Sequence, residues 1–520
     1  MNSIDPPLPE TPPNETIVQS VRAKARAHPE GTAIVCGATR LSWARFDRDI
    51  NRAANLLLVL GVNKGDRIAV LSPNSTDYAT LFMAILRAGA CVTPLSTMAS
   101  PDALQKMLVD CDARAIFVAE HYRHLTQGFI ADLPLMRFAL DFSDEAFRDY
   151  HSELAGAAAT DPMIAIEMAD AFNLIYSSGT TGTPKGILHT HGMRAAQMER
   201  VTPNGYDDNA RTLLSTPLYS NTTIVSFLPT LVGGSTAHLM AKFDATEYLK
   251  IAERERITHT MLVPVQYKRL MDVAEFDRFD LSSMRVKFST SAPLRADVKA
   301  DVLARFPGKL IEYYGLTEGG GVTVLVADEH PTKLHTVGKP APNTDIRLID
   351  AAGTEVPAGE VGEICGRGPA MMAGYFGRDD LTRDYLWRDQ TGTVFFRSGD
   401  MGYFDPDGFL VLSDRKKDMI ISGGLNVYAN DLELVLLADP DVRDAAVIGV
   451  PSDRWGETPL GLVVLHPGAR RSASDICSAA NSKLGKSQRL SDVEARTTLP
   501  RSSVGKILKR ELRRRYWPED

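Results

Sequence analysis

Apolar segments of two different periods alternate along the first part of the chain, and this alternation constrains the fold most strongly. Between residues 42 and 61, apolar side chains recur at helical spacing, with Ser42 placed to cap the start and Gly61 to end it. The apolar run 67–71 is typical of a buried strand, 77–87 has a helical pattern again, and 90–94 is strand-like. Strands that alternate with helices predict a largely parallel sheet and an α/β fold.

The length of the chain and a change of pattern near residue 415 predict two domains. The 520 residues are 44% hydrophobic, enough to bury more than one core. Beyond residue 415 the runs 445–450 and 461–465 are strand-like and 474–484 is helix-like. We expect a flexible tail at 1–16, a large α/β domain at 17–415 and a small α+β domain at 416–520.

Charge and cysteine content narrow the functional classes. The formal net charge of −7 gives no general basic surface for nucleic acid, and the basic end 509–515 is expected to be a solvated helix face, with phosphate contact as the alternative. Five scattered cysteines without metal-ligand spacing favour free thiols in a reducing compartment. Because the sequence has no signal-peptide pattern and no apolar run near the roughly 20 residues of a membrane span, we expect a cytoplasmic protein, with peripheral membrane contact left open.

A loop rich in glycine and hydroxyl residues follows the strand-like run 172–176. Its sequence over 176–186 is Tyr-Ser-Ser-Gly-Thr-Thr-Gly-Thr-Pro-Lys-Gly. Glycine lets backbone N–H groups approach an anion, the hydroxyls add donors and Lys185 adds a cation, a combination that suits polyphosphate. It is not a Walker loop, because Lys185 lies between Pro184 and Gly186. A flexible surface linker is the alternative interpretation.

Further motifs follow this loop along the chain. Tyr313-Tyr314-Gly315-Leu316-Thr317-Glu318 and Ser398-Gly399-Asp400 come first, although Ser-Gly-Asp alone is also ordinary turn chemistry. They are followed by the charged segment 414–418, the glycine pair at 423–424, and a loop at 500–507 that carries Lys506. Together these motifs resemble the signatures of the adenylate-forming superfamily, in the family's order and spacing, over residues 20 to 512.

The resemblance points to the acyl- and aryl-CoA synthetase branch of that superfamily. It implies a large N-terminal domain, built of α/β sheets with helices and a small β region, and a small mobile α+β C-terminal domain. It also implies two half-reactions, in which a carboxylic acid and Mg-ATP give an acyl-adenylate and pyrophosphate, and CoA then takes the acyl group. ATP, Mg²⁺ and CoA are thus the implied cofactors and cosubstrates, and rotation of the C-terminal domain about Lys417 is implied between the two steps.

The resemblance also assigns roles to individual residues. Lys506 is implied to be catalytic, because an ammonium that bridges carboxylate and α-phosphate stabilises the charge built up during adenylation. Thr317 and Glu318 are implied to act at the phosphates and the magnesium ion, with Thr180 as a second metal contact, since a hard cation prefers oxygen ligands. Gly423 and Gly424 are implied to line the CoA tunnel. The implied ATP- and AMP-binding residues are Ser177, Ser178, Gly179, Thr180, Thr181, Lys185, Ser291, Ala292, Pro293, Tyr313, Tyr314, Gly315, Thr317, Asp400 and Arg415.

The identity of the acid is less constrained by these motifs. Ser220 replaces a histidine that many members of the superfamily carry, which puts that residue's usual gating role in doubt. No aspartate lies between residues 215 and 228, so an amino acid, whose buried ammonium would need a partner, is disfavoured. Glycines at 319–321 would leave wall for a flat ring or a branched chain, and we expect an aromatic, cyclic or medium-chain monocarboxylate. The expected acyl-pocket residues are Tyr219, Ser220, Asn221, Val265, Gln266, Gly319 and Gly320.

Three alternatives to a CoA ligase remain at this point. A nucleotide- or acyl-binding protein that has lost catalysis is disfavoured by the intact Lys506, Glu318 and Asp400. A luciferase-like oxidase shares every motif. A separate carrier protein could replace free CoA as acceptor, although the chain ends soon after Lys506 without a carrier domain. The expected assembly is a monomer or a homodimer.

Overall fold

Two compact units make up the fold. The computed structural model describes residues 15–177, 185–415, 418–422, 425–452, 455–484, 488–502 and 505–517. One unit comprises residues 1–345 and 366–396, and the other comprises residues 346–365 and 397–520. The expected α/β class is confirmed. The expected hinge residue, Lys417, lies outside the described residues, and the boundary of the moving part at 415/416 stays a prediction.

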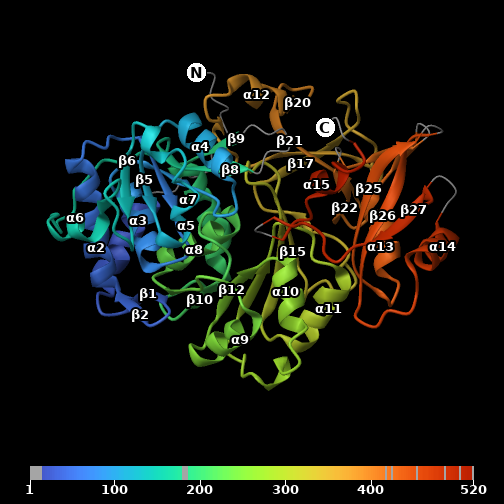
Figure 1. Ribbon diagram of the computed structural model, residues 1–520, viewed down its shortest axis with the longest axis horizontal. Helices are drawn as coiled ribbons and strands as arrows, with labels where there is room; N and C mark the ends of the chain where they lie inside the picture. Colours follow the sequence, from blue (N-terminus) through green and yellow to red (C-terminus); the bar gives the residue numbers. More distant parts are fainter. Residues whose placement is uncertain are drawn as a thin grey trace. The chain divides into compact units, whose positions relative to one another are not determined.

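The first unit contains an eight-stranded sheet whose middle is parallel (Figure 1). Its strands β3, β4, β5, β6 and β8 run parallel to one another, and β9 returns antiparallel to β8. The β8–β9 hairpin therefore flanks the glycine-rich stretch 178–184. In sheet order the strands are β19 (Gly374–Tyr375), β9 (Lys185–Thr190), β8 (Ala171–Ser177), β4 (Cys91–Pro94), β3 (Arg67–Leu71), β5 (Ala113–Val118), β6 (Met136–Ala139) and β7 (Arg148–Asp149).

A second, nine-stranded sheet also belongs to the first unit. Its strands β11, β10, β12, β13 and β14 are neighbours and run parallel, so their carboxyl ends share one edge. In sheet order the strands are β16 (Lys339–Pro340), β15 (Thr323–Val326), β14 (Lys309–Tyr314), β13 (Val286–Ser289), β12 (His259–Leu262), β10 (Arg211–Leu214), β11 (Thr236–Leu239), β1 (Thr32–Cys36) and β2 (Thr39–Ser42).

In the first unit, helix α2 (Trp43–Val59) begins where a capping signal in the sequence places it. The Ser42 hydroxyl accepts a hydrogen bond from the Arg45 N–H at the start of α2, and the apolar positions Phe46, Ile50 and Leu57 are fully buried. The helices are α1 (Ile17–Ala27), α2 (Trp43–Val59), α3 (Thr76–Arg87), α4 (Pro101–Asp110), α5 (Glu120–Arg123), α6 (Tyr150–Ala155), α7 (His191–Val201), α8 (Asn221–Gly233), α9 (Ala245–Arg254), α10 (Pro264–Met271), α11 (Ala296–Arg305) and α12 (Asp379–Asp384).

The later part of the chain is dominated by antiparallel strands. One sheet has the order β17 (Asp345–Ile349), β18 (Gly362–Arg367), β21 (Val394–Phe404) and β20 (Leu386–Arg388), with β22 (Leu410–Arg415) also paired to β21. The other has the order β24 (Leu425–Val427), β23 (Ile420–Ser422), β26 (Gly456–Leu465) and β25 (Val442–Ser452), with β27 (Asp492–Ala495) parallel to β26. Its helices are α13 (Ala429–Leu437), α14 (Ala473–Lys483) and α15 (Lys509–Arg513).

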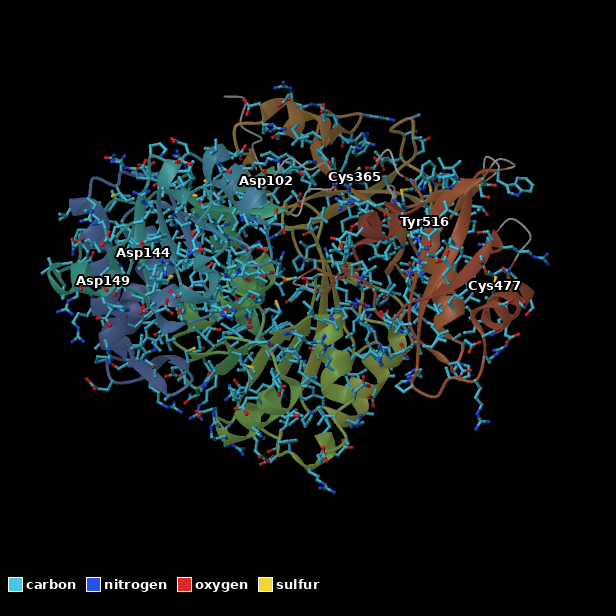
Figure 2. All side chains as sticks on the ribbon, in the orientation of Figure 1. Asp102, Asp144, Asp149, Cys365, Cys477 and Tyr516 are labelled. Carbon is cyan, nitrogen blue, oxygen red and sulfur yellow. The ribbon has the colours of Figure 1, made fainter. Side chains whose placement is uncertain are left out.

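The cysteines and the hydropathy of the helices add two observations. None of the five cysteines forms a disulfide, and of the two labelled in Figure 2, Cys365 is buried in β18 and Cys477 is half-buried in α14. Across the described ranges, no helix has both the length and the apolar character needed to cross a membrane.

Candidate active site

Four neighbouring strands of the nine-stranded sheet end beside one another at the site. The segments after β10, β12, β13 and β14 are 215–221, 263–266, 290–294 and 315–320. Parallel strands bring their carboxyl ends to one edge, where α/β sheets bind ligands. The structure therefore gathers at one edge residues that are far apart in the sequence. They are the expected acyl-pocket residues and six of the expected nucleotide residues: Ser291, Ala292, Pro293, Tyr314, Gly315 and Thr317.

Lys185 and Glu318 are linked through two tyrosines. The Lys185 ammonium donates a hydrogen bond of 3.1 Å to the Tyr385 hydroxyl and lies 4.9 Å from the centre of that ring. Tyr375 donates from its hydroxyl to Glu318 Oε1 at 2.9 Å, and the two tyrosine rings meet edge to face at 5.7 Å. Burial, reinforced by the Glu318 charge, raises the pKa of Tyr375, so its hydroxyl stays protonated as a donor. Neither tyrosine lies in a motif that the sequence singled out.

His189, on β9, connects the two sheets of the unit. Its Nδ1 lies 2.7 Å from Arg194 Nη2 and its Nε2 lies 2.8 Å from the Thr317 carbonyl oxygen. Since a guanidinium can only donate, Nδ1 accepts and the ring proton sits on Nε2, which donates to Thr317. Burial and the charge of Arg194 hold the pKa of His189 well below its usual value, so the ring is neutral. Thr317 is thus fixed through its backbone.

Arg194, on α7, is fully buried and bonded only to neutral acceptors. It donates to Asn173 Oδ1 from Nε at 2.9 Å and from Nη2 at 2.8 Å, to Gln197 Oε1 at 2.8 Å, and to Asn221 Oδ1 at 2.9 Å. With His189, these bonds use all five N–H donors of the guanidinium. Within the described part of the chain, no carboxylate pairs with Arg194, and burial lowers its pKa to about 9, so it remains charged at neutral pH.

The expected acyl-pocket residues after β10 and β12 fall into two groups. Tyr219 is buried, while Ser220 and Asn221 are half-buried at the start of α8. Gln266 is buried in α10, where its amide donates to the Ser215 carbonyl oxygen at 3.3 Å, and Val265 beside it is half-buried. Gln266 therefore holds the segment after β10 in place through its hydrogen bond. That these five residues contact the acid stays a prediction.

Gly319 and Gly320 are required by close packing of the backbone. Both have positive φ, 74° and 81°. A Cβ on Gly319 would overlap the Ala370 carbonyl oxygen, and one on Gly320 would lie 2.9 Å from the Gly366 carbonyl oxygen. The sequence interpretation attributed these glycines to room for the acid, whereas the structure gives the neighbouring backbone at 366–371 as the reason for glycine here.

The segment after β13 is tied to β14 by a buried carboxylate. Glu312 accepts from the Leu294 N–H at 2.7 Å and forms a buried ion pair with Lys299. In the same loop Ser291 has a φ of 79° and its hydroxyl bonds to that of Thr222 on α8, while Ala292 is half-buried and Pro293 is exposed. These bonds fix the loop that the sequence assigns to nucleotide binding.

The two tyrosines of the 313–318 motif point to opposite faces of β14, as strand geometry requires. The Tyr313 ring stacks on Phe288 at 5.8 Å and lies 5.7 Å from the Arg200 guanidinium, within the core of the unit. Tyr314 and Gly315 are half-buried at the strand end. Of these two tyrosines, Tyr314 is therefore the one whose position suits stacking on a purine base.

The later unit carries Asp400 and Lys506. Asp400 is the ladder partner of Arg415 across β21 and β22, so the two expected ribose residues stand directly opposite each other. Around Lys506, the Lys506 N–H donates to the Ser502 hydroxyl at 3.2 Å, and Arg501 binds the Gly505 carbonyl oxygen and Asp444, both at 2.6 Å. Hydrogen bonds with Arg501 and Ser502 therefore hold the backbone at Gly505 and Lys506 in place.

Nine of the expected residues lie, wholly or with their side chains, outside the described part of the structure. Ser177 and Arg415 are described by their backbone only, as the last residues of β8 and β22. The expected residues that lie outside the described ranges are Ser178, Gly179, Thr180, Thr181, Lys417, Gly423 and Gly424.

A cavity of about 390 Å³ lies at another part of the first unit, beside β7. Its lining includes Asp144 and Asp149, both labelled in Figure 2, together with Glu145. Asp144 is paired with Arg123, and the two carboxylates outside that pair disfavour a phosphate or an organic acid there by charge repulsion. The carboxyl edge of the nine-stranded sheet is therefore the better candidate.

Comparisons with known proteins cover both units. A family model described as "AMP-binding enzyme" matches residues 21–376, and one described as "AMP-binding enzyme C-terminal domain" matches 431–506. A feruloyl-CoA synthase of Amycolatopsis is 35% identical over 95% of this chain and 97% of its own, and the long-chain-fatty-acid–CoA ligase FadD13 of Mycobacterium tuberculosis is 29% identical over 95% and 97%. The crystal structure of ATP-bound MatB from Rhodopseudomonas palustris superposes with a TM-score of 0.88, at 27% identity over 96% of this chain and 98% of that one.

Proposed function

The chain belongs to the family of AMP-binding enzymes, and from that premise we propose that it activates an aromatic monocarboxylic acid. Its reaction class is ATP-dependent ligation of a carboxylic acid to CoA through an acyl-adenylate. The observation that carries the choice of acid is the 35% identity to a feruloyl-CoA synthase across nearly the whole chain, against 29% for a fatty-acid ligase of equal coverage.

In the first half-reaction, Lys185 and Thr317 would hold the phosphates of ATP. The Lys185 ammonium already has a neutral partner in Tyr385, so it can exchange that hydrogen bond for a phosphate oxygen without breaking an ion pair. The bond from His189 to the Thr317 carbonyl fixes the peptide that carries the threonine hydroxyl. Tyr314 would offer its ring to the adenine.

Glu318 is the residue that fits a magnesium ion. No group of three or more potential ligands occurs among the described His, Cys, Asp and Glu residues, and Mg²⁺ commonly takes one or two carboxylates together with substrate phosphates. One Glu318 oxygen is bound by Tyr375, so the carboxylate is oriented, and no side chain in the described ranges is bound to its second oxygen. When bound, Mg²⁺ would neutralise phosphate charge.

Two residues of the later unit complete the proposed chemistry of adenylation. Asp400, opposite Arg415 in the ladder, would accept hydrogen bonds from the ribose hydroxyls. Lys506 would stabilise the negative charge that develops when the acid attacks the α-phosphate. The CoA thiol would then reach the adenylate along a path lined by Gly423 and Gly424, attack the acyl carbonyl carbon and release AMP. We place the enzyme in the cytoplasm, as a monomer or homodimer that uses free CoA.

The test is pyrophosphate release with Mg-ATP and CoA across aryl, cyclic, branched and straight-chain acids, with mass detection of the thioester. We expect an aryl acid such as a hydroxycinnamate to give a kcat/KM at least about tenfold above that of any straight-chain acid. The Lys506→Ala variant supplies the background rate. Preference for a straight-chain acid would overturn the proposed substrate class, and pyrophosphate without thioester would indicate another acceptor.

A further inference from the structure

Among the described residues, no carboxylate forms an ion pair with the buried guanidinium of Arg194. A buried guanidinium normally pairs with a carboxylate, because desolvation of an isolated charge is costly. Here four neutral side chains take its donors: Asn173, His189, Gln197 and Asn221. These contacts satisfy hydrogen bonding, and the Phe172 ring, 5.9 Å from the guanidinium, adds a cation–π contact, but no described carboxylate balances the positive charge.

This arrangement dictates which way the Asn221 amide faces. Since Arg194 can only donate, the atom 2.9 Å from its Nη1 must be the Asn221 oxygen. The Nδ2 group then points away from Arg194, and no described residue accepts a hydrogen bond from it. Asn221 is half-buried at the first residue of α8, next to the carboxyl end of β10, where the acid is expected.

We propose that Asn221 selects acids bearing a hydrogen-bond acceptor oxygen away from the carboxylate, and that Arg194 is the positioning residue that aims its N–H donors. The inference rests on the proposed function, because it takes the segment 219–221 as pocket wall. The adjacent cation polarises the amide and strengthens it as a donor, and its field favours an electron-rich oxygen. Suitable groups are a ring hydroxyl, a methoxy group or a carbonyl.

The test compares three aryl acids that differ only in one ring substituent: methoxy, hydroxyl and methyl, placed in turn at each ring position. For the native enzyme, kcat/KM should be roughly three- to tenfold higher for the methoxy and hydroxyl acids than for the methyl acid at one position, as expected for one hydrogen bond. The difference should lie mainly in KM.

Two substitutions at the same position separate donation from packing. Asn221→Leu keeps the size but removes the amide, and should bring the three acids to equal kcat/KM. Asn221→Asp keeps an acceptor for Arg194 but has no donor, so the methoxy preference should disappear while the hydroxyl acid, which can donate, keeps its advantage. Arg194→Met should lower the methoxy-to-methyl ratio with Asn221 intact. If that variant fails to fold, the two Asn221 variants still decide.

An unchanged methoxy-to-methyl ratio in Asn221→Leu would overturn the proposal, as would an equal fall for all three acids, which would mean that Asn221 binds the carboxylate. Failure of the proposed function looks different, because the native enzyme would then release no pyrophosphate with any of the three. In that case the same variants are compared on straight-chain acids with and without a terminal hydroxyl. The ratio of kcat/KM for the acid with the hydroxyl to that for the acid without it then decides.

Discussion

At the scale of single residues, Tyr375 and Tyr385 carry the same hydroxyl group but bind partners of opposite charge. Tyr375 donates to Glu318, whereas Tyr385 accepts from Lys185. We expect Tyr375→Phe to raise the Mg²⁺ concentration for half-maximal pyrophosphate release roughly tenfold, because a hydrogen bond to a charged group is lost and the carboxylate is no longer oriented. Tyr385→Phe is the matched control: it removes the neutral partner that Lys185 would give up for phosphate, and should leave the Mg²⁺ titration nearly unchanged. Identical Mg²⁺ titrations for the two variants would contradict the role assigned to Tyr375.

At the scale of elements, the loop after β14 depends on its close approach to the backbone at 366–371. Gly319→Ala adds a clash with Ala370 to the strain of a positive φ, whereas exposed Gly377, with a φ of 63° and no atom within 4 Å of an added Cβ, carries the strain alone. We expect Gly377→Ala to cost about 1–2 kcal/mol and Gly319→Ala about 1–3 kcal/mol more. Urea unfolding of the two variants measures this difference, and equal losses would show that the loop can relax.

The same scale shows what sequence could and could not predict. The alternation of strands and helices and the Ser42 cap follow from neighbours along the chain, so they were predictable. Tyr375 and Tyr385 were missed because nothing in residues 370–390 forms a motif, and their role exists only once β19 pairs with β9. His189 and Arg194 did carry a signal, a titratable side chain within a strand and a charged side chain within a helix. Only the fold shows that the two side chains are in contact.

At the scale of the whole molecule, the two-step reaction predicts that Lys506 matters to one step only. Lys506→Ala should slow acyl-adenylate formation roughly 10²–10³-fold, because a cation that stabilises the transition state is lost. Thioester formation from pre-formed acyl-AMP should stay within about threefold of the native rate. Single-turnover assays of each half-reaction measure this, with Lys483→Ala, an exposed lysine on α14, as the control. Equal loss in both steps would rule out the separation of the two steps.

The shared edge of β10, β12, β13 and β14 also bears on how such a gene can diverge. The nucleotide motif follows β14, while the proposed acid-facing residues follow β10 and β12, about fifty to a hundred positions earlier in the chain. After a duplication, a few codon changes after one strand can therefore alter which compound is consumed and leave activation by ATP intact. A mutant library restricted to 219–223 and 263–266 would explore new substrates on an inherited catalytic apparatus.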